Sequence, residues 1–79
     1  MRCLILLAAI LALAGCKSEG ERAEQRYEIV KSEGTASDRC AAANAVADAY
    51  LQAEDSDNFG KWRAVAAMEC VRARVEAGR

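Results

Sequence analysis

The placement of Cys40 and Cys70 on either side of a turn-forming sequence constrains the fold of this 79-residue chain more than any other feature. Asp55-Ser56-Asp57-Asn58 combines residue types that favour turns and helix N-caps, and residue 55 is the midpoint between the two cysteines. In an antiparallel helical hairpin, facing residues lie at equal distances from the turn. The spacing therefore predicts a hairpin in which the two cysteines face each other.

The segments on both sides of this turn have the composition of helices. The chain contains no Pro, and its abundant Ala, Glu, Arg and Val make helix the expected state. We expect one helix to begin at Thr35 or Ser37 and to end near Ala53. Thr35 and Asp38 fit a capping box, while Ser37 is a competing N-cap. The other helix is expected over residues 58–77.

Each of these predicted helices carries apolar or small residues on one face. The first presents Cys40, Ala43, Ala47, Tyr50 and Leu51. The second presents Phe59, Trp62, Ala66, Cys70 and Ala73, flanked by Val65 and Met68. Because Ala47 falls opposite the region of Trp62, a small side chain there leaves room for a large one.

Upstream, residues 21–33 are expected to form a charged helix with a thin apolar stripe. Ala23, Tyr27 and Val30 recur at helical spacing on one face, and Gly34 suits a helix C-terminus because glycine tolerates positive φ. The stripe leaves two interpretations open. The segment is either a docked third helix or a solvated spacer.

The N-terminus has the pattern of an export signal. Met1-Arg2 supplies a positive charge, and the apolar run from Leu4 to Ala14 follows soon after. Its 11 residues would reach about 16 Å as a helix, roughly half of a bilayer's hydrocarbon core. This length fits a signal peptide and is too short for a membrane-spanning helix.

Leu13-Ala14-Gly15-Cys16 closes the apolar run and resembles the lipobox of bacterial lipoproteins. The resemblance covers residues 1–16. It implies that the signal is cut before Cys16, that the thiol receives a diacylglyceryl group, and that the new amine is acylated, for instance with palmitate. By similarity to enterobacterial lipoproteins, Lys17 favours the outer membrane, facing the periplasm. The alternative is an ordinary secretory signal, because Ala12-Leu13-Ala14 also reads as an A-x-A cleavage site.

The number of cysteines favours the lipoprotein interpretation. Cys3 leaves with the signal, and lipidation of Cys16 leaves Cys40 and Cys70 as an even pair. In an oxidising compartment disulfides persist, so we expect these two to be bonded; two buried reduced thiols are the alternative. Simple secretion would instead leave an odd set of three cysteines.

Several classes of function find little support in the residues. With no His, the chain cannot build a Cys-His dyad, a His-based triad or an H-E-x-x-H zinc site. The 11 Lys and Arg against 12 Asp and Glu create no broad basic field for nucleic acid. The stretch Asp55-Ser56-Asp57-Asn58-Phe59-Gly60 begins like a calcium loop, but Phe59 and Ala66 stand where oxygen ligands are required. We therefore expect no catalytic residues, no metal and no cofactor other than the lipid on Cys16.

Two further features allow both a functional and a structural interpretation. Phe59 and Trp62, near the tip of the hairpin, are candidate partner-binding residues, although such aromatics more often form the core. Glu69 is either a carboxylate with a tuned pKa or, as we expect, a residue at the edge of the helix interface that pairs with Arg72 or Arg39.

Together these patterns predict an all-α protein in three parts. Residues 1–15 form a lipoprotein signal peptide, residues 16–34 a lipidated N-terminus and helical tether, and residues 35–79 a disulfide-linked antiparallel helical hairpin. The expected role is a non-enzymatic structural or interaction module in the cell envelope, held at the membrane and meeting an envelope protein or peptidoglycan. The alternatives are a membrane-active lipoprotein of the entericidin-like or lysis-related kind, and an inhibitor or exclusion lipoprotein that blocks a partner protein.

Overall fold

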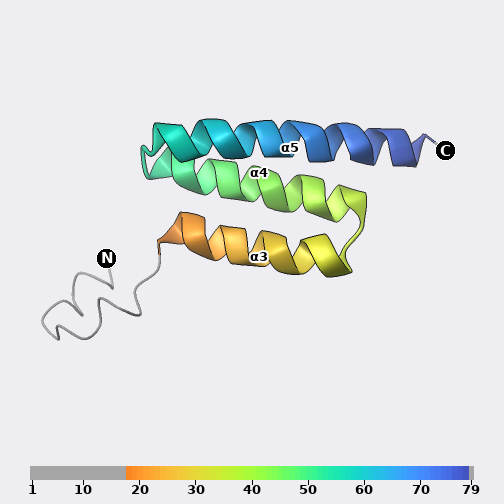
Figure 1. The fold of residues 1–79 in the computed structure, drawn as a ribbon, viewed down its shortest axis with the longest axis horizontal. Helices are drawn as coiled ribbons and strands as arrows, with labels where there is room; N and C mark the ends of the chain where they lie inside the picture. The colour runs from red at the N-terminus through yellow and green to blue at the C-terminus, as the bar shows by residue number, and fades with distance from the viewer. Residues whose placement is uncertain (1–17, 79) are drawn as a thin grey trace, which may run out of the picture.

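The structure, a computed structural model, describes residues 18–78, so the lipobox and the prediction for Cys16 lie outside the described residues. The described chain forms three helices: α3 (Glu19–Glu33), α4 (Ala36–Gln52) and α5 (Ser56–Ala77). Successive helices run antiparallel, and α4 lies between α3 and α5 (Figure 1). The predicted all-α helical hairpin is therefore confirmed as α4 and α5, and the upstream segment is a helix docked against it.

Each helix begins at a side chain that satisfies free backbone N–H groups. Thr35 and Asp38 form the predicted capping box of α4, so Ser37 is not the N-cap. Ser18 and Glu21 form a second capping box at the start of α3 that the sequence analysis did not identify. At α5 the N-cap is Asp55, and the helix therefore begins two residues before its predicted start.

Gly34 ends α3, as predicted, but for a different reason. Its φ is −102° and its ψ is 179°, an extended conformation open to any residue, so the expected positive φ is wrong. The glycine is instead required by close packing. A Cβ at this position would lie 2.9 Å from the Cβ of Asp38 and 3.0 Å from Cγ1 of Val30. The positive φ of the described chain belongs to Glu54, at 59° in the turn between α4 and α5.

The predicted disulfide between Cys40 and Cys70 is present and fixes the register of the hairpin. The two Cα atoms are 4.6 Å apart, near the short end of the range that disulfides span. Helix axes must approach closely to allow this, and the small side chains of Ala43 and Ala66, both buried, permit that approach.

All three helices contribute to a single core, which consists mainly of small and aromatic side chains. Its members are Ala23, Tyr27, Ala43, Val46, Ala47, Tyr50, Trp62 and Ala66. The packing of α3 on α4 depends on Gly20, because a Cβ there would overlap the ring of Tyr50. In the predicted stripe, Ala23 and Tyr27 are thus buried and Val30 is half-buried, and the docked-helix interpretation is the correct one.

The structure corrects the predicted core at three positions. Val46 was not expected in the core, yet its exposed fraction is 0%. Leu51 was placed on the buried face of α4, and Met68 beside that of α5, yet their exposed fractions are 52% and 67%. The predicted buried face of α4 was the one that pairs with α5 in the hairpin. Because α3 also covers α4, its buried surface shifts toward Val46 and away from Leu51.

Candidate functional site

Within residues 18–78, the buried charged side chain is that of Glu69, which joins side chains from all three helices. The hydroxyl of Tyr27 in α3 donates a 2.5 Å hydrogen bond to Oε2 of Glu69. From α4, Nε of Arg39 donates to Oε1 at 3.2 Å. Within α5 itself, Nη1 of Arg72 lies 3.9 Å from the same oxygen. The predicted pairing of Glu69 with Arg39 and Arg72 is therefore confirmed, although Glu69 is buried and not at the edge of the interface.

These contacts set the protonation states within the cluster. The hydrogen bond from Tyr27 lowers the pKa of the Glu69 carboxyl, with help from Arg39, while burial opposes that shift. Burial, followed by the hydrogen bond to Glu69, raises the pKa of Tyr27 to about 12. At neutral pH the cluster thus holds a carboxylate, a neutral phenol and a guanidinium.

The arrangement suits a structural role, because both carboxylate oxygens are already engaged by protein donors. Arg39 also donates to the carbonyl of Gly34, at 3.4 Å, and so links the cluster to the α3–α4 connection. A carboxylate that acts as a general base must reach a proton on its substrate. The cluster instead connects the helices to one another.

A second buried tyrosine makes a similar link about one turn earlier along α3. Tyr50 of α4 donates a short hydrogen bond to Oε2 of Glu24. This hydrogen bond, together with burial, raises the pKa of Tyr50 to about 12. Each tyrosine therefore places its ring in the core and donates its hydroxyl to a glutamate of another helix.

The two candidate partner-binding aromatics lie in different environments. Trp62 is 7% exposed and packs edge-to-face on Tyr27, with ring centroids 5.2 Å apart and an interplanar angle of 79°. Its buried Nε1 has no hydrogen-bond partner. Phe59 is half-buried, and the guanidinium carbon of Arg63 lies 5.9 Å from its ring centroid. Of the two, Phe59 has a surface that a partner could reach without opening the core.

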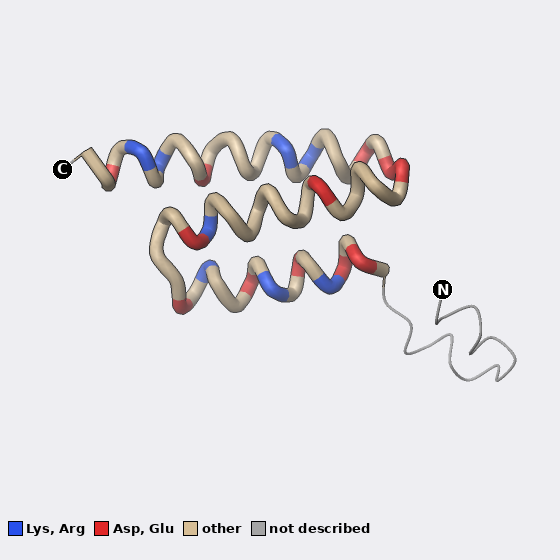
Figure 2. The backbone as a smooth tube through the Cα atoms, turned by 180° about the vertical axis from the view of Figure 1, so that it is seen from behind, with Lys and Arg blue, Asp and Glu red and all other residues tan. Residues whose placement is uncertain are grey.

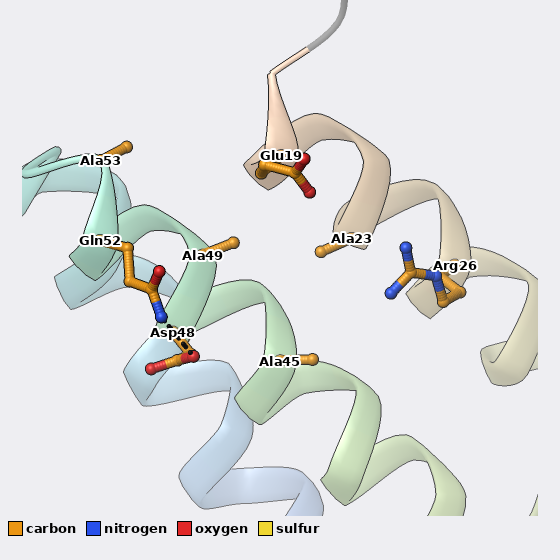
Figure 3. Close-up of a pocket in the computed structure, with 8 residues that line it drawn as sticks. All are labelled: Glu19, Ala23, Arg26, Ala45, Asp48, Ala49, Gln52 and Ala53. Atoms are coloured by element: carbon orange, nitrogen blue, oxygen red, sulfur yellow. Dashed lines mark hydrogen bonds between the residues drawn. The ribbon is translucent and has the colours of Figure 1, made fainter. Parts of the chain in front are cut away.

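A groove of about 600 Å³ runs between α3 and α4 (Figure 3). Alanines line its inner surface, namely Ala23, Ala45, Ala49 and Ala53. The polar residues that line it are Glu19, Arg26, Asp48 and Gln52. Gln52 donates to Asp48 at 3.3 Å, so two of these groups satisfy each other. The groove holds no side chain that could act as a nucleophile other than carboxylates.

The acidic turn caps a helix. Oδ1 of Asp55 accepts from the backbone N–H of Asn58, and Oδ2 accepts from its side-chain amide. The predicted N-cap role is thereby confirmed. Among residues 18–78, no group of three or more Cys, Asp or Glu side chains is arranged to hold a metal ion.

The outer face of α5 carries exposed apolar side chains. Met68, Val71 and Val75 are each at least half exposed and lie around a shallow hollow lined also by Ala67 and Arg72. Lysines and arginines occur in the N-terminal half of this helix and again toward its C-terminal end (Figure 2). None of the helices that the structure describes combines the length and apolar character needed to cross a bilayer.

Comparisons with known proteins yield no relative: no protein-family model, no characterised protein and no solved structure matches the chain significantly.

Proposed function

We propose that this protein is a lipoprotein of the bacterial envelope, anchored through Cys16, whose disulfide-linked helical domain is a non-enzymatic interaction module at the membrane surface. The observation that carries the proposal is the disulfide between Cys40 and Cys70. This disulfide uses both cysteines that follow Cys16. Cys16 is therefore the one cysteine of the processed chain that remains for thioether formation, and it lies in the lipobox-like sequence.

The disulfide also supports the compartment. Disulfides persist in the periplasm and are rare in the cytosol, where thiols are kept reduced. A signal that delivers the chain to an oxidising compartment and a domain that contains a disulfide are mutually consistent. Lys17 supports the outer membrane as the final location, by the same similarity to enterobacterial lipoproteins.

The start of α3 supports a domain held close to the bilayer. Ser18 is the N-cap of α3, and it follows Cys16 by two residues, which span at most about 7 Å when extended. Two or three acyl chains provide stable anchoring, whereas one is marginal. Confinement at the membrane then raises the effective concentration of the domain toward other envelope components.

Labelling with an alkyne analogue of palmitate tests the anchor. We expect the full-length chain to incorporate the label and to sediment with membranes. Cys16→Ser should abolish both, and Cys3→Ser should abolish neither, because Cys3 leaves with the signal. Label that persists in Cys16→Ser, or is absent from the wild-type chain, would contradict the proposal.

The outer-membrane location is tested separately by density-gradient separation of the two membranes. The wild-type chain is expected in the outer-membrane fraction, and Lys17→Asp should shift it toward the inner membrane. Lys17→Arg is the matched control and should leave the distribution unchanged. A wild-type chain in the inner membrane would rule out the location without affecting the anchor.

A further inference from the structure

The outer face of α5 is apolar along most of its length, although α5 already buries its opposite face in the core. Its residues are Ala64, Ala67, Met68, Val71 and Val75, all exposed. Their positions follow the i, i+3, i+4, i+7 spacing of one helical stripe, whereas Trp62, Ala66 and Glu69 point to the other side. We call these five residues the outer stripe. Three of them are among the five large exposed apolar side chains of the described chain.

Basic residues border the outer stripe on both sides. At 100° per residue, Lys61 and Arg72 flank it on one side, and Arg63 and Arg74 flank it on the other. Of the acidic residues of α5, Glu69 is buried, and Asp57 and Glu76 lie near the two ends of the helix. The stripe therefore presents apolar surface framed by four cations, of which Arg72 also lies 3.9 Å from Glu69.

From this pattern we infer that the outer stripe binds an amphipathic helix of another envelope protein, one whose apolar face is bordered by Asp and Glu. This inference rests on the proposed function and names the class of partner. Apolar burial supplies the affinity, and the opposite charges select and orient the partner.

A second copy of the chain is a poorer fit in both arrangements. If the outer stripes of two copies packed together, the four cations of one copy would lie against the four cations of the other and repel them. The acidic side of α3, around Glu21, Glu24 and Glu28, would attract the cations. However, Ile29 is the single large apolar side chain that α3 exposes, so this contact would bury little apolar area.

The membrane that holds the anchor is also a poorer fit. The stripe lies on the side of α5 opposite its buried residues, and α3 lies on the far side of α4 (Figure 1). With α5 flat on the bilayer, α3 would stand two helix spacings above it, roughly 16–20 Å. The two residues from Cys16 to Ser18 span at most about 7 Å, so the lipid could not reach the bilayer.

Site-specific photo-crosslinking tests the inference on the full-length chain in living cells. A photoreactive amino acid replaces Val71, and the crosslinked species are identified by mass spectrometry. We expect a segment of a different protein that carries apolar residues at helical spacing beside Asp and Glu. Crosslinks only to phospholipid, to a second copy or to a basic or neutral segment would overturn the inference, as would the absence of any adduct.

Charge reversal separates a specific contact from collision. In Lys61→Glu/Arg74→Glu the crosslink should fall by roughly tenfold, the effect of converting two attractive exposed pairs into repulsive ones. Arg22→Glu/Lys31→Glu is the matched control, with one change near the start and one in the last turn of α3. Its yield should stay within about twofold of the wild type. Equal losses in both variants would overturn the inference.

The same cells report on the anchor independently. Palmitate labelling of Cys16 is read in each sample, because neither double variant alters the lipobox. A labelled chain whose probe marks only phospholipid would refute the partner class alone, whereas an unlabelled chain would refute the proposed function.

Discussion

The hydroxyl of Tyr27 donates a 2.5 Å hydrogen bond to Glu69, so that two residues 42 positions apart join the first and last helices of the described chain. The two side chains thereby connect α3 and α5, although α4 lies between these helices (Figure 1). Because Glu69 also accepts from Arg39, one carboxylate connects all three helices, and its charge state should matter for stability.

Glu69→Gln is expected to destabilise the domain at pH 7 by about 1–3 kcal/mol, because the amide cannot accept on both sides as the carboxylate does. The pKa of Glu69 is lowered in the folded state, so its stabilisation is present above the unfolded pKa and is lost as the pH falls through the folded one. Urea denaturation at several pH values measures the difference, which should shrink as the pH falls below 4.5, the ordinary pKa of this carboxyl. A difference independent of pH would contradict the assignment.

Reduction of the disulfide between Cys40 and Cys70 should lower the free energy of unfolding by about 3.5 kcal/mol in the chain-entropy model, given a separation of 30 residues. A domain of this size has a small free energy of unfolding, so we expect the reduced protein to be largely unfolded at 37 °C. Thermal melts followed by circular dichroism, with and without reductant, measure the effect. Cys40→Ser/Cys70→Ser should melt like the reduced protein and should not respond to reductant.

The hairpin could be predicted from the sequence because two local signals agree. The midpoint of Cys40 and Cys70 coincides with Asp55, which caps α5, and Thr35 with Asp38 marks the start of α4. Capping and turn formation depend on neighbouring residues, and a disulfide in a hairpin leaves one register. Local capping signals therefore sufficed for the helices, and the spacing of the two cysteines sufficed for their pairing.

The docking of α3 could not be decided in the same way, because it depends on contacts between distant residues. The space that Gly20 leaves for the ring of Tyr50 and the hydrogen bond from Tyr27 to Glu69 have no signature within a short window of sequence. Because these contacts could not be predicted, the buried face of α4 was placed too far from Val46. The sequence pattern predicted the pairing of Glu69 with arginines, but it did not predict the hydrogen bond from Tyr27.

Gly20→Ala is expected to destabilise the protein by about 1–3 kcal/mol, because the added methyl group overlaps the ring of Tyr50 and pushes α3 away from α4. Gly60→Ala is the matched control. No atom lies within 4 Å of the Cβ that it would add, and replacing an exposed helical glycine by alanine should stabilise α5 by up to about 1 kcal/mol. Opposite signs in chemical denaturation are therefore expected, and equal effects would show that the contact between Gly20 and Tyr50 does not limit stability.

Trp62 and Phe59 should respond differently to truncation, because only the first lies in the core. Trp62→Ala is expected to cost about 3–5 kcal/mol and to loosen the helices, as with other large-to-small changes at buried aromatics. Trp62→Phe should cost much less, since it keeps most of the apolar ring and removes the buried Nε1 that has no partner. Phe59→Ala should cost less than Trp62→Ala, since Phe59 is half-buried.

Loss of partner binding in Phe59→Ala, with near-wild-type circular dichroism and melting, would assign the hairpin tip to recognition. Unchanged binding in this variant would leave both aromatics with a structural role.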